Sequence, residues 1–409
     1  GAGGSAGAAG RAWPDAANPA RVASTPASAS GPAPILAPAA LQANVSDIAF
    51  VNATPGPTPF ISRAELRGQS LAKVAAISFT IAAQPGAHAK PVHVQYKLRF
   101  LLTHGFEPSR GTMTLPVFGL YAGRINTVTL NVQFQDGSTQ TLPIYIATEP
   151  YVDPTHIYDH ATVVRARDPQ VELGFDYFYL KSGYRSPVVF DTDGAPRWLA
   201  ANLPWAYSTT FTNNGFLIGD LRSMGMYRVG LDGTVVHFDA QTTTFLNFDH
   251  NIDRGKEAFL AGVNMFADGI KSFESTVAEI TSSGALLRQW ELAKIISDHM
   301  LRHGDDPTLF VRPPENWLHL NSSAYDPSDD SLIVSSRENF LMKVDYSTGA
   351  IRWIFGDPAK YWYTFPSLRA KAITLPPGDL YPIGQHSVSF TSDGLLMVFN
   401  VANADGTCS

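Results

Sequence analysis

Cysteine is nearly absent from this sequence: Cys408 is the single one among 409 residues. One thiol cannot form a disulfide within the chain, so the fold must hold together without such cross-links. The count is compatible with both an oxidising and a reducing compartment. Long apolar runs are missing as well, because no stretch approaches the length needed to span a bilayer.

An excess of positive charge is also lacking. Lys and Arg number 30 against 36 Asp and Glu, which gives a formal net charge of -6. The two signs are interspersed, so no basic patch is visible in the sequence. This balance argues against a general nucleic-acid binder.

Glycine, proline and aromatic residues are abundant, with Gly 33, Pro 29 and 11% aromatic residues. Together with 44% hydrophobic residues, this composition predicts an all-β protein with many turns. Residues 1–41 are mostly Ala, Gly, Pro and Ser, which favours a flexible tether. Residues 42–150 carry short alternating patterns between turns, which predicts a small immunoglobulin-like β-sandwich. Its strands are expected in AAISFTIAA, VHVQYKLRFLLTH, TMTLPVF, INTVTLNVQF and QTLPIYIAT.

Two short sequence units alternate within residues 151–409. The first is a strand, a turn with Gly and a second strand, as in VVFDTDGAPRW, MYRVGLDGTVV, VAEITSSGALLRQW and LMKVDYSTGAIRW. Its turn glycines are 39, 51 and 65 residues apart: Gly194, Gly233, Gly284 and Gly349. The second unit is a turn followed by a short apolar run, as in NNGFLIG, GKEAFLAG, DDSLIVSS and SDGLLMVF. Antiparallel repeats of roughly 40 to 50 residues are typical of propeller blades, so this region is predicted to form a β-propeller.

The repeat places four polar residues at one equivalent position. Counting back nine residues from the start of the apolar run gives Tyr207, His250 and His386 in three of the copies. His319 lies thirteen residues before Leu332, which fits a longer hairpin. Rotation about a propeller axis relates such positions, so we expect these side chains to converge. Each histidine taken singly is better explained as a turn cap, but three coincide among only 11 in the chain.

The stretch from Glu315 to Gly356 adds an arginine, Arg337, and an amide, Asn321, to this set. Imidazole titrates near neutrality and can act as nucleophile, acid or base. An arginine fork holds a tetrahedral oxyanion through two hydrogen bonds. These residue types suit the transfer of a phosphoryl or sulfuryl group, where positioning and charge neutralisation do most of the work. The sequence has no GxxxxGK[ST] loop and no acidic cluster for Mg²⁺, which argues against an activated nucleotide donor.

Three motifs in this region resemble the bacterial arylsulfate sulfotransferases that do not use phosphoadenosine phosphosulfate. In chain order they are FDHNIDRGKEAFLAG, ENWLHLNSSAYDPSDDSLIVSSRENFLMKVDYSTGAIRWIFGDP and GQHSVSFTSDGLLMVFN. The resemblance extends, more weakly, over roughly residues 45 to 400. It implies an N-terminal β-sandwich followed by a six-bladed β-propeller.

The resemblance also implies a ping-pong reaction that needs no cofactor. His386 would attack the sulfur of an aryl sulfate donor to give a sulfohistidine, and a phenolic acceptor would then take the group. By the same matching, His250, His319 and Arg337 would hold the sulfuryl oxygens, with one of the histidines exchanging the phenol proton.

Two further residues and the expected partners complete the prediction. Asn321 is an expected substrate contact, while Tyr207 rests mainly on the repeat. The expected partners are the aryl sulfate donor and the phenolic acceptor, with no nucleic acid and no membrane span, and a homodimer is left open. A periplasmic or secreted location follows from the resemblance alone, since no signal-peptide pattern is visible in the printed chain.

The C-terminal end departs from the family pattern. The chain stops nine residues after Asn400, and only four blades are recognisable, so the propeller is predicted to be C-terminally incomplete. A non-enzymatic propeller that serves as a binding scaffold, or an inactive fragment, therefore remains an alternative. A zinc site built from the three histidines is a second alternative. No HxH or HExxH spacing occurs and an arginine lies nearby, so no metal is expected.

Overall fold

The computed structural model describes residues 47–103, 106, 110–159, 161–168, 170–181, 187–201, 203, 208–267 and 269–400. Tyr207 and the predicted tether, residues 1–41, lie outside the described residues, as does Cys408. Within the described residues the chain is built mainly from antiparallel strands, so the all-β prediction is confirmed.

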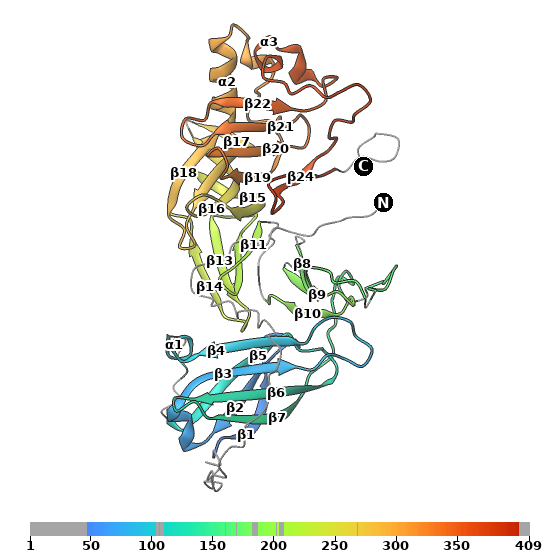
Figure 1. Cartoon of the computed structure of the whole chain (residues 1–409). Helices are drawn as coiled ribbons and strands as arrows, with labels where there is room; N and C mark the ends of the chain where they lie inside the picture. Colours follow the sequence, from blue (N-terminus) through green and yellow to red (C-terminus); the bar gives the residue numbers. More distant parts are fainter. Residues whose placement is uncertain are drawn as a thin grey trace, which may run out of the picture.

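Two antiparallel sheets form the N-terminal part of the molecule, drawn in blue and teal in Figure 1. One sheet has the order β1-β2-β5 and the other the order β4-β3-β6-β7. Apolar side chains alternate along these strands, and those of both sheets, such as Leu66, Leu115, Phe79 and Leu130, meet in one buried cluster. The predicted sandwich is therefore confirmed. Its elements are β1 Ala49–Pro55, β2 Ile61–Arg67, η1 Gln69–Lys73, β3 Val74–Ile81, β4 Val92–Lys97, β5 Thr112–Phe118, β6 Ile125–Phe134 and β7 Thr139–Ala147.

The stretch VHVQYKLRFLLTH was predicted as one strand, and this prediction was wrong. Strand β4 ends at Lys97, and helix α1 follows as Leu98–Thr103. The alternation of apolar and polar residues stops at this point. Leu101 is fully buried in the sandwich core, and the ring of Phe100 stacks on Tyr96 with centroids 5.4 Å apart. Tertiary packing of one helical turn thus replaces strand pairing here.

Five antiparallel sheets follow the sandwich along the chain (Figure 1). Within each sheet every strand pairs with the next one in sequence, which is a β-meander. The first sheet contains β8 Tyr177–Leu180, β9 Val188–Asp191 and β10 Pro196–Leu199. The second contains β11 Thr209–Thr212, β12 Gly215–Gly219, β13 Gly225–Gly230 and β14 Val235–Asp239. The third contains β15 Phe245–Arg254, β16 Phe259–Ala267, β17 Ile270–Ile280 and β18 Leu286–Glu291.

The fourth and fifth sheets are the last two in the described part of the chain. They contain β19 Leu320–Asp326, β20 Ser331–Ser336, β21 Leu341–Asp345 and β22 Ile351–Phe355, then β23 His386–Phe390 and β24 Leu396–Phe399. The four predicted turn glycines join the last two strands of the first four sheets, and their φ angles lie between +71° and +90°. Glycine adopts this backbone region without steric cost, which explains why the repeat carries it there.

The first strands of neighbouring sheets contact each other. Strand β15 contacts β11 and β19, and β19 also contacts β23. Equivalent strands of successive sheets are thus neighbours. Closure of the sheets into a six-bladed propeller stays a prediction.

Helices cover one edge of the third and fourth sheets, at the top of Figure 1. Leu292, Ile296 and Met300 of α2 are buried in the same core cluster as Trp290 and Trp362. None of the helices in the described residues is long and apolar enough to cross a membrane. The helical elements are α2 Leu292–Arg302, η3 Pro307–Leu309, η4 Tyr361–Thr364 and α3 Pro366–Arg369.

A buried arginine joins the sandwich to the sheet β8–β10. The guanidinium of Arg197 donates to the carbonyl oxygen of Gly119 at 2.6 and 3.0 Å and pairs with Asp191 Oδ2 at 3.0 Å. It also lies 3.6 Å from the ring centroid of Tyr121. Each nitrogen of the guanidinium thus has a hydrogen-bond partner, which a buried charge needs because it no longer contacts water.

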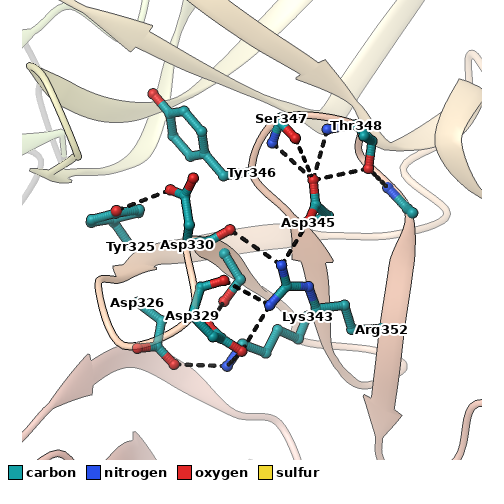
Figure 2. A network of polar contacts seen from close by, with 12 residues as sticks. Tyr325, Asp326, Asp329, Asp330, Lys343, Asp345, Tyr346, Ser347, Thr348 and Arg352 are labelled. Carbon is teal, nitrogen blue, oxygen red and sulfur yellow. Dashed lines mark hydrogen bonds and ion pairs between the residues drawn. The ribbon is translucent and has the colours of Figure 1, made fainter.

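A network of charged residues closes one end of the hairpin β19–β20 (Figure 2). Lys343 Nζ lies 2.7 Å from Asp326 Oδ2 and 2.8 Å from Asp329 Oδ2. Arg352 bridges Asp329 and Asp345 at 2.8 and 2.6 Å. The acidic turn that follows β19 is therefore part of the scaffold, and we call this group of five residues the Lys343 network.

Candidate functional site

The three predicted histidines lie at matching places in three sheets. His250 is in β15, His319 directly precedes β19, and His386 begins β23. Each strand shifts its pairing register beside its histidine, and such a bulge re-aims side chains. The φ angle is +37° at His250, +52° at His319 and +52° at Ser387. Positive φ is uncommon for residues other than glycine and concentrates at functional sites.

The hairpin β19–β20 fixes His319 beside Arg337. The backbone N–H of Arg337 donates to the carbonyl oxygen of His319 at 3.0 Å. The backbone N–H of His319 donates to Asn316 Oδ1, also at 3.0 Å. These bonds hold the two residues at the end of the hairpin opposite the Lys343 network.

Two of the predicted histidines are neighbours in the structure. The rings of His250 and His319 have centroids 5.2 Å apart at an angle of 58°. The charges of His250 and Arg337 both lower the pKa of His386, so all four groups lie within electrostatic reach of one another. We call His250, His319, His386 and Arg337 the histidine cluster.

His386 is held in one tautomer. Its Nδ1 lies 2.9 Å from the carbonyl oxygen of Gly384, which can only accept a hydrogen bond. The proton of the neutral ring therefore sits on Nδ1, and the lone pair is on Nε2. Burial lowers the pKa of His386, and the charges of His250 and Arg337 lower it further. The hydrogen bond to the Gly384 carbonyl acts in the opposite direction and raises this pKa. The neutral ring is thus favoured at neutral pH.

The pKa values of the other two histidines shift in opposite directions. Burial, followed by the charge of His250, lowers the pKa of His319. Burial also disfavours the charge of His250, but the Asp249 carboxylate outweighs burial and raises the pKa of His250. Nδ1 of His250 lies 2.7 Å from Asp249 Oδ1, although their orientation is not that of a hydrogen bond. The contact is therefore an attraction of charges.

Glu274 faces the cluster and was missed by the sequence analysis. It lies in β17, and its Oε2 is 3.6 Å from His319 Nε2 while its Oε1 is 4.0 Å from His250 Nδ1. Asn316 Nδ2 donates to its Oε2 at 2.5 Å. Burial, and then the charge of Asp249, raises the pKa of Glu274 to about 7. The repeat gives no indication of Glu274, because the strands that correspond to β17 in the other units have no acidic residue at the equivalent position.

Glu338 balances the arginine of the cluster. Its Oε1 lies 3.3 Å from Arg337 Nη1 and 3.7 Å from His319 Nδ1. The Arg337 side chain is 29% exposed, so its guanidinium is accessible from solvent. These separations are longer than those of the Lys343 network.

Asn321 lies behind the cluster, within the protein. It is buried, and its Nδ2 donates at 2.6 Å to the carbonyl oxygen of Gln385, the residue before His386. Gln385 is buried too and donates to the carbonyl oxygen of Ser336. The Asn321 amide thus ties β19 to β23 next to His386. Tyr207, the remaining predicted contact, lies outside the described residues.

One set of side chains in the described residues has the spacing of a metal site. Ligand atoms of His250, Glu274 and His319 all lie within 4.8 Å of one another. It differs from the three-histidine zinc site that the sequence analysis weighed and rejected, since it includes Glu274 in place of His386.

Comparison with known proteins identifies the relatives of this chain. A family model described as Arylsulfotransferase (ASST) matches residues 161–407, and one described as Arylsulfotransferase Ig-like domain matches residues 69–149. Arylsulfate sulfotransferase AssT of Escherichia coli O6:H1 is 27% identical over a segment that covers 34% of this chain and 29% of that protein. The AssT of Lelliottia amnigena is 29% identical over 23% of this chain and 20% of that protein.

The matched segments thus span less than a third of the length of either curated relative. Among solved structures, the computationally designed Ika4 protein aligns with a TM-score of 0.25 and 11% identity, over 48% of this chain and 90% of that chain.

Proposed function

We propose that this chain, which belongs to the arylsulfotransferase family, moves a sulfuryl group from an aryl sulfate to a phenol by a ping-pong mechanism. The intermediate is a sulfohistidine at His386. The observation that carries this proposal is the neutral His386 ring, with its lone pair on Nε2, next to His250, His319 and Arg337. No cofactor is needed for these steps.

His386 suits the role of nucleophile for two reasons. The Gly384 carbonyl holds the proton on Nδ1, so Nε2 is the atom that attacks sulfur. Burial and the neighbouring charges favour the neutral ring, which is the reactive form. A protonated imidazole would have no lone pair to offer.

The rest of the histidine cluster suits an anionic sulfuryl group. Arg337 can present two N–H donors to its oxygens, and His250 adds a positive charge where Asp249 raises its pKa. These donors are in place before the reaction and stabilise the negative charge that develops on the sulfuryl oxygens during transfer.

The two chemical steps are balanced. In the first, Nε2 of His386 forms an N–S bond while the S–O bond to the aryl oxygen breaks, and the phenolate leaves with that electron pair. In the second, the acceptor oxygen forms a new S–O bond, and the N–S bond breaks to return the lone pair to Nε2. The acceptor releases one proton and the departing phenolate takes up one. The first phenolate takes its proton from solvent. In the second step the neutral ring of His319, whose pKa is lowered, accepts the proton of the acceptor phenol and passes it to solvent.

The chemistry favours aryl over alkyl donors. A phenol has a pKa of about 10, so phenolate is a far better leaving group than an alkoxide. Transfer between two phenols is nearly thermoneutral, which is consistent with a reversible covalent intermediate. The partners proposed are accordingly small phenolic molecules, and the family suggests a periplasmic or secreted location.

Asn321 is proposed as a positioning residue. Its bond to the Gln385 carbonyl holds the backbone that precedes His386, and its buried side chain acts through that backbone. This differs from the substrate contact that the family resemblance implied.

Incubation with 4-nitrophenyl sulfate and phenol tests the proposal. We expect release of nitrophenolate that depends on phenol, and His386→Ala should abolish it with the melting temperature unchanged. The loss should be about 10⁴-fold or more, as for other enzymes that lose a nucleophile. Absence of release from the folded wild-type chain would favour the binding scaffold.

A further inference from the structure

Carboxylates gather on the side of the cluster that faces Glu274. The oxygens of Asp249, Glu274 and Glu338 lie 2.7–4.0 Å from ring nitrogens of His250 and His319. Imidazole nitrogens next to carboxylate oxygens form a donor set that suits a metal ion.

We infer that His250, Glu274 and His319 bind a divalent transition-metal ion of the zinc class. This site goes beyond the proposed function and does not rest on it. Nδ1 of His250 and Nε2 of His319 lie 4.0 and 3.6 Å from the two Glu274 oxygens, and the ligand atoms all lie within 4.8 Å of one another.

The donor types select the class of metal. Two imidazole nitrogens and one carboxylate oxygen suit zinc and its neighbours in the first transition row. Calcium and magnesium prefer oxygen ligands alone. Zinc bonds to nitrogen and carboxylate oxygen are about 2.0–2.2 Å long, so ligand atoms that lie within 4.8 Å of one another have to move closer around the ion.

An unsatisfied atom marks the position. Nδ1 of His250 is buried without a hydrogen-bond partner among the described residues. A buried polar atom of this kind is costly, and a metal ion would satisfy it. Asp249 Oδ1, at 2.7 Å from this nitrogen, can serve as an outer carboxylate or a fourth ligand.

All three ligand residues have strained backbones. The φ angle is +37° at His250, +44° at Glu274 and +52° at His319. Eight residues other than glycine have positive φ in the described part of the chain, and three of them meet at this one point. Such strain persists where the surroundings enforce it, often at ligand sites.

A bound metal ion would compete with the sulfuryl donor. It would occupy His250 and His319, two of the groups proposed to hold the donor's oxygens. Glu338, at 3.3 Å from Arg337 Nη1, offsets the repulsion that this arginine exerts on the ion. Zinc should therefore inhibit transfer.

Titration of the full metal-free chain with ZnCl₂, followed by calorimetry, tests the site. We expect one ion per chain. Glu274→Gln keeps the shape of the side chain but removes its charge, and should weaken binding by more than about 100-fold, since even an outer partner costs 10- to 100-fold. Two matched variants should bind as the wild type: Glu315→Gln, at an exposed glutamate, and His303→Ala, at the residue that follows α2 and packs against the ring of His299.

Two further readouts keep the test decisive. Cobalt(II) in place of zinc should give the visible absorption of a four- or five-coordinate nitrogen and oxygen site, and Glu274→Gln should lose it. Zinc affinity unchanged by Glu274→Gln, or weakened equally by His303→Ala, would overturn the proposal. Zinc binding is measured without substrate, so a failed transfer assay would leave this result unaffected.

Discussion

The two ends of the hairpin β19–β20 carry charged residues in opposite states. At one end, the ion pairs of the Lys343 network are 2.6–2.8 Å long (Figure 2). At the other, Arg337 and His319 lie 3.3–3.7 Å from the oxygens of Glu338 and Glu274, and only the contact of His250 with Asp249, at 2.7 Å, is as short. The Arg352 guanidinium holds the pKa of Asp345 far below its usual range, whereas burial raises that of Glu274 to about 7. The first end is a set of ion pairs within the protein, and the second carries the groups that we propose to hold the sulfuryl donor.

The comparison predicts that the two ends respond differently to mutation. At the histidine cluster, Arg337→Lys should lower kcat/KM for 4-nitrophenyl sulfate by about 100- to 1000-fold, the usual cost of one lost oxyanion donor. A single ammonium cannot reproduce the bidentate fork. The melting temperature should stay within error, and Arg312→Lys, at an exposed pair, is the matched control. Near wild-type turnover would remove Arg337 from the site.

The Lys343 network should show the reverse effect. Lys343→Met leaves Asp326 and Asp329 without their buried cation, and should lower the free energy of unfolding by about 3 kcal/mol. Nitrophenolate release per folded molecule should change little. Lys256→Met is the matched control, because its pair with Asp330 is partly exposed and contributes about 1 kcal/mol or less. Chemical denaturation measures both, and equal losses would contradict the distinction.

Asn321 connects the site to the scaffold and should give an intermediate result. Asn321→Leu removes the donor to the Gln385 carbonyl, which costs about 1–3 kcal/mol for a buried group left unpaired. We expect kcat to fall about tenfold with KM little changed, since His386 is displaced while the oxygen-holding groups stay. A rise in KM at constant kcat would instead indicate a direct substrate contact.

The smallest effect concerns pH. The pKa of His386 lies below its ordinary value of about 6.5, so the neutral nucleophile persists as pH falls to that value. The folded-state pKa of Asp345 is depressed, so its stabilising contribution is full above about pH 4 and is lost only as pH falls further. On account of His386, activity should not decline before the pH falls to about 6.5, and the contribution of Asp345 to stability should persist to about pH 4. A pH profile of kcat/KM beside one of unfolding tests both limits.

Much of the architecture was predictable from the sequence, because strand periodicity and turn glycines are local signals. Residues 112–118 and 125–134 are strands with the predicted bounds. The repeat also matched His250, His319 and His386, which lie in or directly before the first strands of three successive sheets. Glu274 was not predictable, since its position depends on how β17 packs against β19. Helix α2 was missed because it interrupts the repeat and is stabilised by tertiary burial of Leu292 and Ile296.

The central claim is that His386 carries the sulfuryl group, and mass spectrometry tests it most directly. The full chain is treated with 4-nitrophenyl sulfate in the absence of phenol, quenched under basic conditions and digested. The account predicts a mass increase of one sulfuryl group on the peptide that contains His386, lost again when phenol is added. Nitrophenolate release with no modified peptide, or with the modification on another residue, would contradict it.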